Sequence, residues 1–244
     1  MSSIVLLALT PASMAEVSVS VSINTAPPAL PVYDQPECPA AGYMWVPGYW
    51  SYGEDGYYWV PGLWVLAPQP GYLWTPGYWG RHIGFYGGVC YGYGYTGTGF
   101  YGGYWRSGVY CYNRSVTNVN VTVVHNTYTK TVVNNTTVSN VSYNGGTGGI
   151  LAKPTAKQLA GAQERHIPAT ALQTQHQQTA STNHELFASA NHGQPSPAAL
   201  AKTSAASSAG TGADAKGKNA KGHGSQRKFS KPEREPREHE RHER

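Results

Sequence analysis

Large aromatic and apolar side chains recur at fixed intervals in three consecutive segments between residues 42 and 79. The three segments, 42–50, 56–64 and 71–79, share the pattern Gly-Tyr-x-Trp-(Val/Thr)-Pro-Gly-x-Trp. Turn-forming residues separate them, with Asp55-Gly56 after the first segment and 67–71 after the second. The pattern therefore predicts three antiparallel strands, at 43–52, 57–66 and 72–80.

Each predicted strand contains an internal Pro-Gly, which allows two interpretations. Proline cannot donate to a strand ladder, so the dipeptide suits a bulge, and one bulged residue would bring the two tryptophans of a repeat to the same face. The alternative is a type II turn that folds each repeat into a small hairpin. We favour the bulge, because Asp-Gly is the better hairpin turn. Three bulged strands would carry one layer of six tryptophans: Trp45, Trp50, Trp59, Trp64, Trp74 and Trp79.

Weaker strand patterns flank the repeats. Residues 17–23 alternate strictly between apolar and polar and lead into a proline-rich linker, which together make up segment 16–41. The Gly/Tyr-rich stretch 83–112 predicts irregular strands and loops, and the Val/Asn/Thr-rich stretch 115–143 predicts one or two more strands. We therefore expect a mainly β fold, with a small antiparallel aromatic-rich sheet in residues 42–149.

The pattern changes after Pro154 to an Ala/Gln/His-rich, helix-favouring segment, 150–193. One short helix is expected to run to about residue 165, and a second from after Pro168 to 191–193, where Gly193 can supply a left-handed cap. The apolar face of the second helix is thin, so that helix is marginal without a partner. The remainder, 194–244, has the composition of a disordered basic tail.

Charge and aromatic content divide the chain in the same way. Residues 43–112 hold all seven tryptophans and 15 of the 18 tyrosines. The first 150 residues carry four Lys+Arg and five Asp+Glu, whereas the last 94 carry 14 and eight. The basic character belongs to the tail, where acids interleave with the bases and dilute the field. We therefore expect no nucleic-acid partner.

The first 15 residues resemble an export signal. A short apolar run, 3–9, precedes Ser13-Met-Ala15, which offers small residues at the positions a signal peptidase requires. No Lys or Arg precedes the run, so a plain N-terminal strand remains the alternative. The run is too short to span a bilayer, and no second apolar stretch follows. We expect an exported chain without a transmembrane segment after cleavage, located in the periplasm, the outer envelope or outside the cell.

Three cysteines, Cys38, Cys90 and Cys111, suit an oxidising compartment with one bridge and one remaining thiol. Cys90 and Cys111 bracket the Gly/Tyr-rich stretch and form the better candidate disulfide. Closing the loop between them would stabilise the fold by about 3 kcal/mol. Three unrelated thiols are the alternative. None of the cysteines has the spacing of a zinc site.

Candidate chemistry is sparse. Gly92–Gly97 matches the dinucleotide pattern Gly-x-Gly-x-x-Gly, but no helix or βαβ unit accompanies it, so no cofactor is expected. His166, His176, His184 and His192 are 10, 8 and 8 residues apart, which spreads them around a helix, and no metal site is expected. The acids Glu54 and Asp55 are neighbours in a turn and do not flank a cleft. We expect no catalytic residues and no enzymatic activity.

The repeat, in Trp45–Trp50, Trp59–Trp64 and Trp74–Trp79, resembles that of the bacterial YXWGXW (WXXGXW) repeat-containing proteins, an exported family with no assigned activity. The resemblance covers about forty residues and implies a bacterial envelope protein, without implying any site residue. The expected function is that of a structural or interaction protein, with an envelope glycan or another envelope protein as partner. The alternative is a glycan-binding module that uses exposed Trp/Tyr rows. We favour a buried tryptophan core over such a platform, because a small sheet needs that burial for stability.

Overall fold

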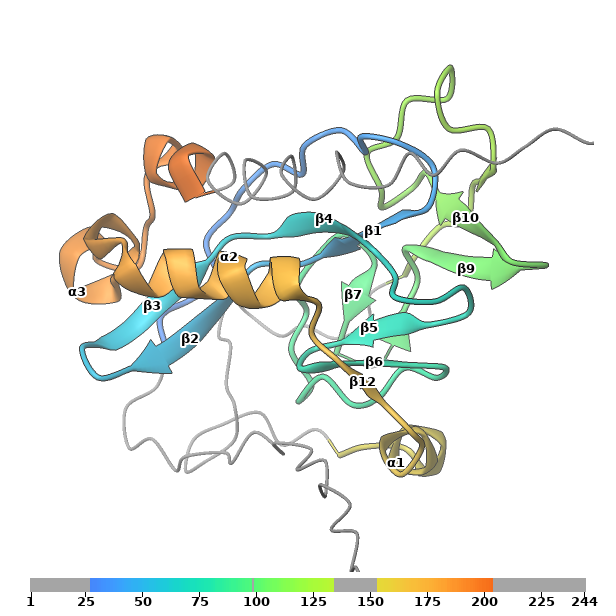
Figure 1. Ribbon diagram of the computed structural model, residues 1–244, viewed down its shortest axis with the longest axis horizontal. Helices are drawn as coiled ribbons and strands as arrows, with labels where there is room; N and C mark the ends of the chain where they lie inside the picture. Colours follow the sequence, from blue (N-terminus) through green and yellow to red (C-terminus); the bar gives the residue numbers. More distant parts are fainter. Residues whose placement is uncertain (1–26, 98, 134–152, 204–244) are drawn as a thin grey trace, which may run out of the picture.

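The computed structural model describes residues 27–97, 99–133 and 153–203 (Figure 1). Short antiparallel strands form most of the regular structure in these ranges, which confirms the mainly β prediction. The expected signal peptide, the strand at 17–23 and residues 204–244 of the predicted tail lie outside the described residues. Within the described ranges, no helix has the length and apolar character that crossing a bilayer requires.

Each of the three repeats is divided into two strands at its Pro-Gly. The strands are β1 (Tyr43–Val46), β2 (Tyr49–Gly53), β3 (Gly56–Val60), β4 (Leu63–Leu66), β5 (Leu73–Thr75) and β6 (Tyr78–Gly80). The first two repeats form one long antiparallel hairpin, in which β2 pairs with β3 and β1 pairs with β4. The turn of this hairpin lies at Glu54-Asp55, as the Asp-Gly signal predicted, and Gly56 has a φ of +98°.

The predicted bulge is wrong for this hairpin. Val46 lies opposite Leu63 and Tyr49 lies opposite Val60, so each strand leaves the same two residues, Pro and Gly, unpaired. A bulge places an extra residue on one strand only. Here each strand carries a proline at the same point of the hairpin. Neither proline has an N–H to donate, so the hydrogen-bond ladder is interrupted in both strands.

The third repeat follows the alternative interpretation. β5 and β6 pair with each other, and Thr75 lies opposite Tyr78 across a two-residue loop. Pro76 at the second position and Gly77 with a φ of +105° at the third are the pattern of a type II turn. The predicted pairing of the second repeat with the third across 67–71 does not form, because β4 is already paired with β1.

The strands after the repeats are short and irregular. They are β7 (Tyr95–Thr96), β8 (Gly99–Phe100), β9 (Gly103–Arg106), β10 (Val109–Asn113) and β11 (Thr127–Tyr128). Between residues 115 and 133 only β11 is extended and paired, although the Val/Asn alternation at 119–124 predicted a strand. Asn113 Oδ1 accepts the Ser115 N–H, and Asn120 Oδ1 accepts the Thr122 N–H, so side chains close turns in place of a ladder.

The first predicted helix forms, but the second, expected to run to 191–193, ends at Thr182 because Asn183 adopts an extended conformation; a short strand lies between the two helices. They are α1 (Ala156–Ala162), β12 (Ile167–Pro168) and α2 (Ala171–Thr182), followed by η1 (His184–Leu186) and α3 (Ala188–Asn191). Thr155 and Thr170 each begin a helix with a capping box, in which a Gln at the third helical position completes the exchange. The left-handed cap of α3 is His192, and Gly193 after it also has a positive φ.

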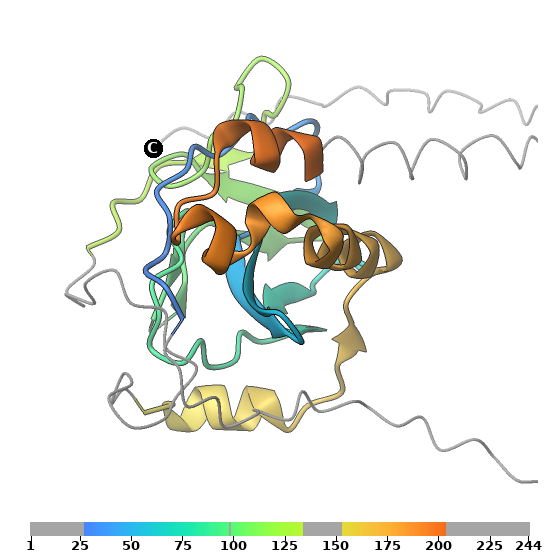
Figure 2. The same cartoon turned by 90° about the vertical axis from the view of Figure 1, so that its left-hand side faces the viewer.

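The described core consists of two clusters. One contains side chains of β1, β4–β6 and β10, together with Cys38, Tyr86, Tyr95 and Val124. The other lies between the β2–β3 hairpin and the helical segment, which crosses the hairpin in Figure 1. β12 adds a strand to β6, and α1 lies apart from α2 and α3 in both views (Figure 2).

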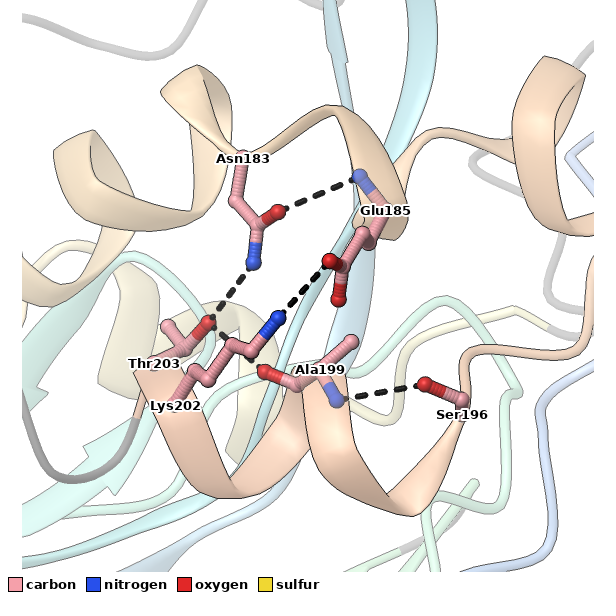
Figure 3. Close-up of polar contacts among 6 residues, drawn as sticks. All are labelled: Asn183, Glu185, Ser196, Ala199, Lys202 and Thr203. Carbon is pink, nitrogen blue, oxygen red and sulfur yellow. Dashed lines mark hydrogen bonds and ion pairs between the residues drawn. The ribbon is translucent and has the colours of Figure 1, made fainter.

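Residues 197–203 are helical and packed, although the sequence analysis placed them in the disordered tail. Ala199 and Thr203 are buried. Lys202 Nζ lies 2.8 Å from Glu185 Oε1, and Asn183 Nδ2 lies 3.5 Å from Thr203 Oγ1 (Figure 3). Ala199 belongs to the second core cluster, and Leu200 packs against it.

Candidate functional site

The six repeat tryptophans form three pairs across neighbouring strands. In each pair the first tryptophan of a repeat lies directly opposite a second tryptophan. The ring centroids are 5.3 Å apart in every pair, with interplanar angles of 64°, 67° and 59°. The pairs are Trp45–Trp64 and Trp50–Trp59, which join repeats one and two, and Trp74–Trp79, within repeat three.

The glycines of the first two Pro-Gly breaks receive the rings of the opposite repeat. A Cβ added to Gly48 would lie 2.4 Å from Trp59 Cζ2, and one added to Gly62 would lie 2.3 Å from Trp45 Cζ2. The two contacts are reciprocal, so repeats one and two are related by an approximate twofold arrangement. Gly77 of the third repeat has no atom within 4 Å of such a Cβ. Its glycine is needed for the turn instead of for ring packing.

The second tryptophan of each repeat donates its indole N–H to a segment outside the repeats. Trp50 Nε1 donates to Ala29 O at 3.1 Å, and Trp64 Nε1 donates to Pro36 O at 3.0 Å. Trp79 Nε1 donates to Gln173 Oε1 of α2 at 2.9 Å. The proline-rich segment and α2 are thus attached to the repeats through equivalent indole positions.

Side chains from outside the repeats also satisfy backbone groups near the two breaks. The Tyr33 hydroxyl accepts the Gly48 N–H at 3.0 Å, and Tyr95 donates to Trp45 O at 2.7 Å. Burial raises the pKa of both Tyr33 and Tyr95, so the hydroxyls stay protonated and neutral. The sequence signal for the Tyr95 contact was the density of tyrosine in 83–112, which we interpreted only as irregular structure, whereas Tyr33 lies in the proline-rich segment and gave no such signal.

His176 of α2 bonds to a backbone group at the Pro-Gly break of the second repeat. Its Nε2 lies 2.8 Å from Pro61 O, and the side chain is fully buried. A carbonyl oxygen can only accept, so Nε2 carries the hydrogen in this contact. Burial lowers the pKa of His176, which favours the neutral ring. The helix that appeared marginal in the sequence is therefore held by Gln173 and His176, two polar side chains buried on its inner face.

The tryptophans do not form one exposed layer. Five of the six are buried, Trp64 is half-buried, and they divide between the two core clusters. The single-face prediction is wrong because it assumed one bulged residue per strand, whereas the symmetric breaks redirect the chain. Most of the rings have the place that we favoured, in the core.

The structure contains no Cys90–Cys111 disulfide, contrary to the candidate pairing. Cys111 lies within β10 and is buried, while Cys90 Sγ accepts the N–H of Gly97 at 3.3 Å within its own loop. Cys38 lies within the proline-rich segment and is buried, and its thiol donates to Ala40 O. Burial raises the pKa of the Cys38 thiol, so it stays protonated.

The four histidines of the helical segment lie in separate environments. His166 stacks on Tyr78 with centroids 3.7 Å apart, His176 bonds to Pro61, His184 stacks on Phe187, and His192 caps α3. In the part of the chain that the structure describes, no three His, Cys, Asp or Glu side chains are arranged to hold a metal ion.

An exposed acid–base pair was not anticipated from the sequence. His82 Nδ1 lies 2.7 Å from Glu164 Oε1, with side chains 54% and 37% exposed. A Cβ on Gly161 of α1 would lie 3.3 Å from His82 Cβ, so the helix packs closely on this loop. The pair attaches α1 to the repeat region at the surface.

These features define a small β protein in which an aromatic repeat forms the core and flanking segments seal it. Residues 41–65 and 70–82 match the family model of the WXXGXW repeat, in two copies, so the chain carries this repeat. The first match spans both repeats of the long hairpin, and the second spans the self-paired third repeat. Comparison with curated proteins and with solved structures gave no match.

Proposed function

We propose that this protein is a non-enzymatic structural or interaction protein of the bacterial cell envelope. The observation that carries the proposal is the use of the repeat as an internal scaffold. Its tryptophans are paired and mostly buried, and two of their indole N–H groups bind the proline-rich segment and a third binds α2. Such a construction produces a rigid frame, and it leaves recognition to the surface segments around it.

The titratable groups are distributed in a way that supports a non-catalytic role. The shifted pKa values belong mainly to buried tyrosines, with Cys38 and His176, and burial is the largest cause in each case. These side chains hold backbone groups or fill the core. Glu54 and Asp55 lie side by side at the exposed tip of the β2–β3 hairpin.

Export is tested by fractionating cells that express the full chain and by measuring the molecular mass of the recovered protein. The apolar run at 3–9 predicts cleavage after Ala15 and recovery in the periplasmic or membrane fraction. Leu7→Arg places a charge inside the run and should retain an uncleaved chain in the cytoplasm. The matched control, Ser2→Arg, adds the same residue before the run and should leave export intact. Wild-type protein that stays uncleaved in the cytoplasm contradicts the proposal.

A further inference from the structure

An open groove of about 740 Å³ lies between the proline-rich segment and the turn that follows β10. Neither the repeat nor the scaffold role accounts for it. Its lining is polar and carries both signs of charge. The residues that matter below are Asp34, Gln35, Tyr93, Arg114, Ser115 and Asn118.

The groove is held in shape by hydrogen bonds between its two sides. The Asn118 N–H donates to Gln35 Oε1 at 2.6 Å, and Asn118 Nδ2 donates to Gln35 O at 2.9 Å. Asn113, which is fully buried, closes the turn by accepting the Ser115 N–H. It also binds Tyr101 O and Lys130 O through Nδ2. The lining is therefore preorganised by buried polar contacts, as a binding site requires.

Several polar groups of this lining are not used by the fold. Asp34 and Arg114 form no ion pair with another residue of the described ranges, although they carry opposite charges. Gln35 is 5% exposed, and its Nε2 is buried without a hydrogen-bond partner in the described structure. Tyr93 has a φ of 50°, a conformation that non-glycine residues rarely adopt. Strained backbone and unsatisfied buried donors concentrate at functional sites.

We propose that this groove binds an acidic carbohydrate, a sugar ring that carries a carboxylate. The Arg114 guanidinium is the natural partner of a carboxylate, since its fork can donate two parallel hydrogen bonds. The Asp34 carboxylate can accept ring hydroxyls, and Tyr93 supplies an aromatic wall. This inference goes beyond the envelope role proposed above, because binding of such a ligand does not depend on where the protein is located.

The geometry favours a sugar over a peptide. Peptides commonly bind by adding a strand to an exposed sheet edge. The floor of this groove is a turn, in which the Val116 N–H bonds to Asn113 O, and residues 114–119 contain no strand. The groove therefore has side-chain donors and acceptors for hydroxyls, and it lacks the extended backbone that a peptide would pair with.

The test is a calorimetric titration of the full chain with trigalacturonic acid, its methyl ester and a trialanine peptide. We expect the acid to bind, the ester to bind about tenfold more weakly, and the peptide not to bind. Arg114→Gln should weaken binding of the acid about tenfold and bring it to the level of the ester. Asp34→Asn should weaken binding of both sugars. The matched controls are Arg106→Gln, an exposed arginine of β9 outside the groove, and Asp55→Asn, in the hairpin turn.

Three results would overturn the proposal. They are an absence of heat with the acid, equal binding of the acid by wild type and Arg114→Gln, and binding of the peptide in place of the sugar. Circular dichroism of each variant verifies that the fold is retained, which we expect because Arg114 and Asp34 are exposed. Failure of this test leaves the export test unaffected, and a cytoplasmic wild-type chain leaves the titration interpretable.

Discussion

Replacing Gly48 or Gly62 with alanine tests the reciprocal packing of the first two repeats. The added methyl carbon would lie 2.4 Å from Trp59 Cζ2 or 2.3 Å from Trp45 Cζ2. Because two carbons prefer about 3.5–4.0 Å, each ring has to move by about 1 Å. Trp59 is 1% exposed and Trp45 is 4% exposed, so the displaced rings have no open space to enter.

The size of the effect follows from three contributions. Forcing extra volume into a packed core costs about 1–3 kcal/mol, and disturbing the edge-to-face contact with the paired tryptophan costs up to about 1 kcal/mol. The lower entropy of the unfolded alanine chain returns about 0.5 kcal/mol. We expect the free energy of unfolding to fall by about 2–3 kcal/mol in each variant. Gly53→Ala is the control, since its nearest atoms, of Tyr58, would lie at 3.4 and 3.8 Å.

The assay is urea unfolding followed by circular dichroism and by tryptophan fluorescence. A double-mutant cycle identifies the cause, because Trp59→Phe removes the atom that Gly48→Ala meets. The cost of Gly48→Ala should fall sharply in the Trp59→Phe background and stay unchanged in the Trp45→Phe background. Gly62→Ala should show the opposite dependence. If Gly48→Ala is as stable as Gly53→Ala, or couples equally to both tryptophans, the reciprocal arrangement is wrong.

Three further changes test how the other segments are attached. Because burial holds the folded-state pKa of His176 below its usual 6.5, the unfolded chain binds the proton first, so stability should fall as pH drops below about 6.5. His176→Gln should remove this pH dependence in urea titrations. Gln173→Ala should lower the free energy of unfolding by about 2–3 kcal/mol, because it leaves the Trp79 N–H buried without its acceptor. Gln158→Ala, in the other capping box, should lower it by about 1 kcal/mol. Asn113→Ala should cost about 3 kcal/mol or more, measured as a shift of the thermal midpoint, because four hydrogen bonds end at this fully buried side chain.

Local signals in the sequence predicted many of the elements and the pairing across the Asp55-Gly56 turn, whereas the other pairings could not be predicted. The Asp55-Gly56 turn and the start of the helix after Pro168 follow from backbone chemistry within a few residues. The five-residue spacing of Trp45 and Trp50 was explained by a bulge, which is a property of one strand. The actual cause is a break shared by two strands, and it becomes visible only once the register of the hairpin is known.

The sequence allowed us to predict which residues form the candidate site, but it did not show which residues surround them. The sequence indicated that the tryptophans would be buried, but the groups that bury them come from far along the chain. Gln173 lies 94 residues from Trp79, and His176 lies 115 residues from Pro61. Neither Gln nor His signals a core position by itself, because both are usually exposed unless a specific partner satisfies them.

The third repeat shows that the repeated sequence specifies a pairing rule more than a conformation. In all three repeats the first tryptophan lies opposite a second tryptophan, with nearly the same ring geometry. Repeats one and two satisfy this rule with each other, and a tryptophan ring covers the glycine of each Pro-Gly. The third repeat has no fourth to pair with, so its Pro-Gly turns by the positive φ of Gly77 and brings its own two tryptophans together. Glycine after proline permits both outcomes, since it tolerates the close ring of the first and the backbone angle of the second. The presence or absence of a neighbouring repeat therefore decides which conformation the same nine-residue pattern adopts.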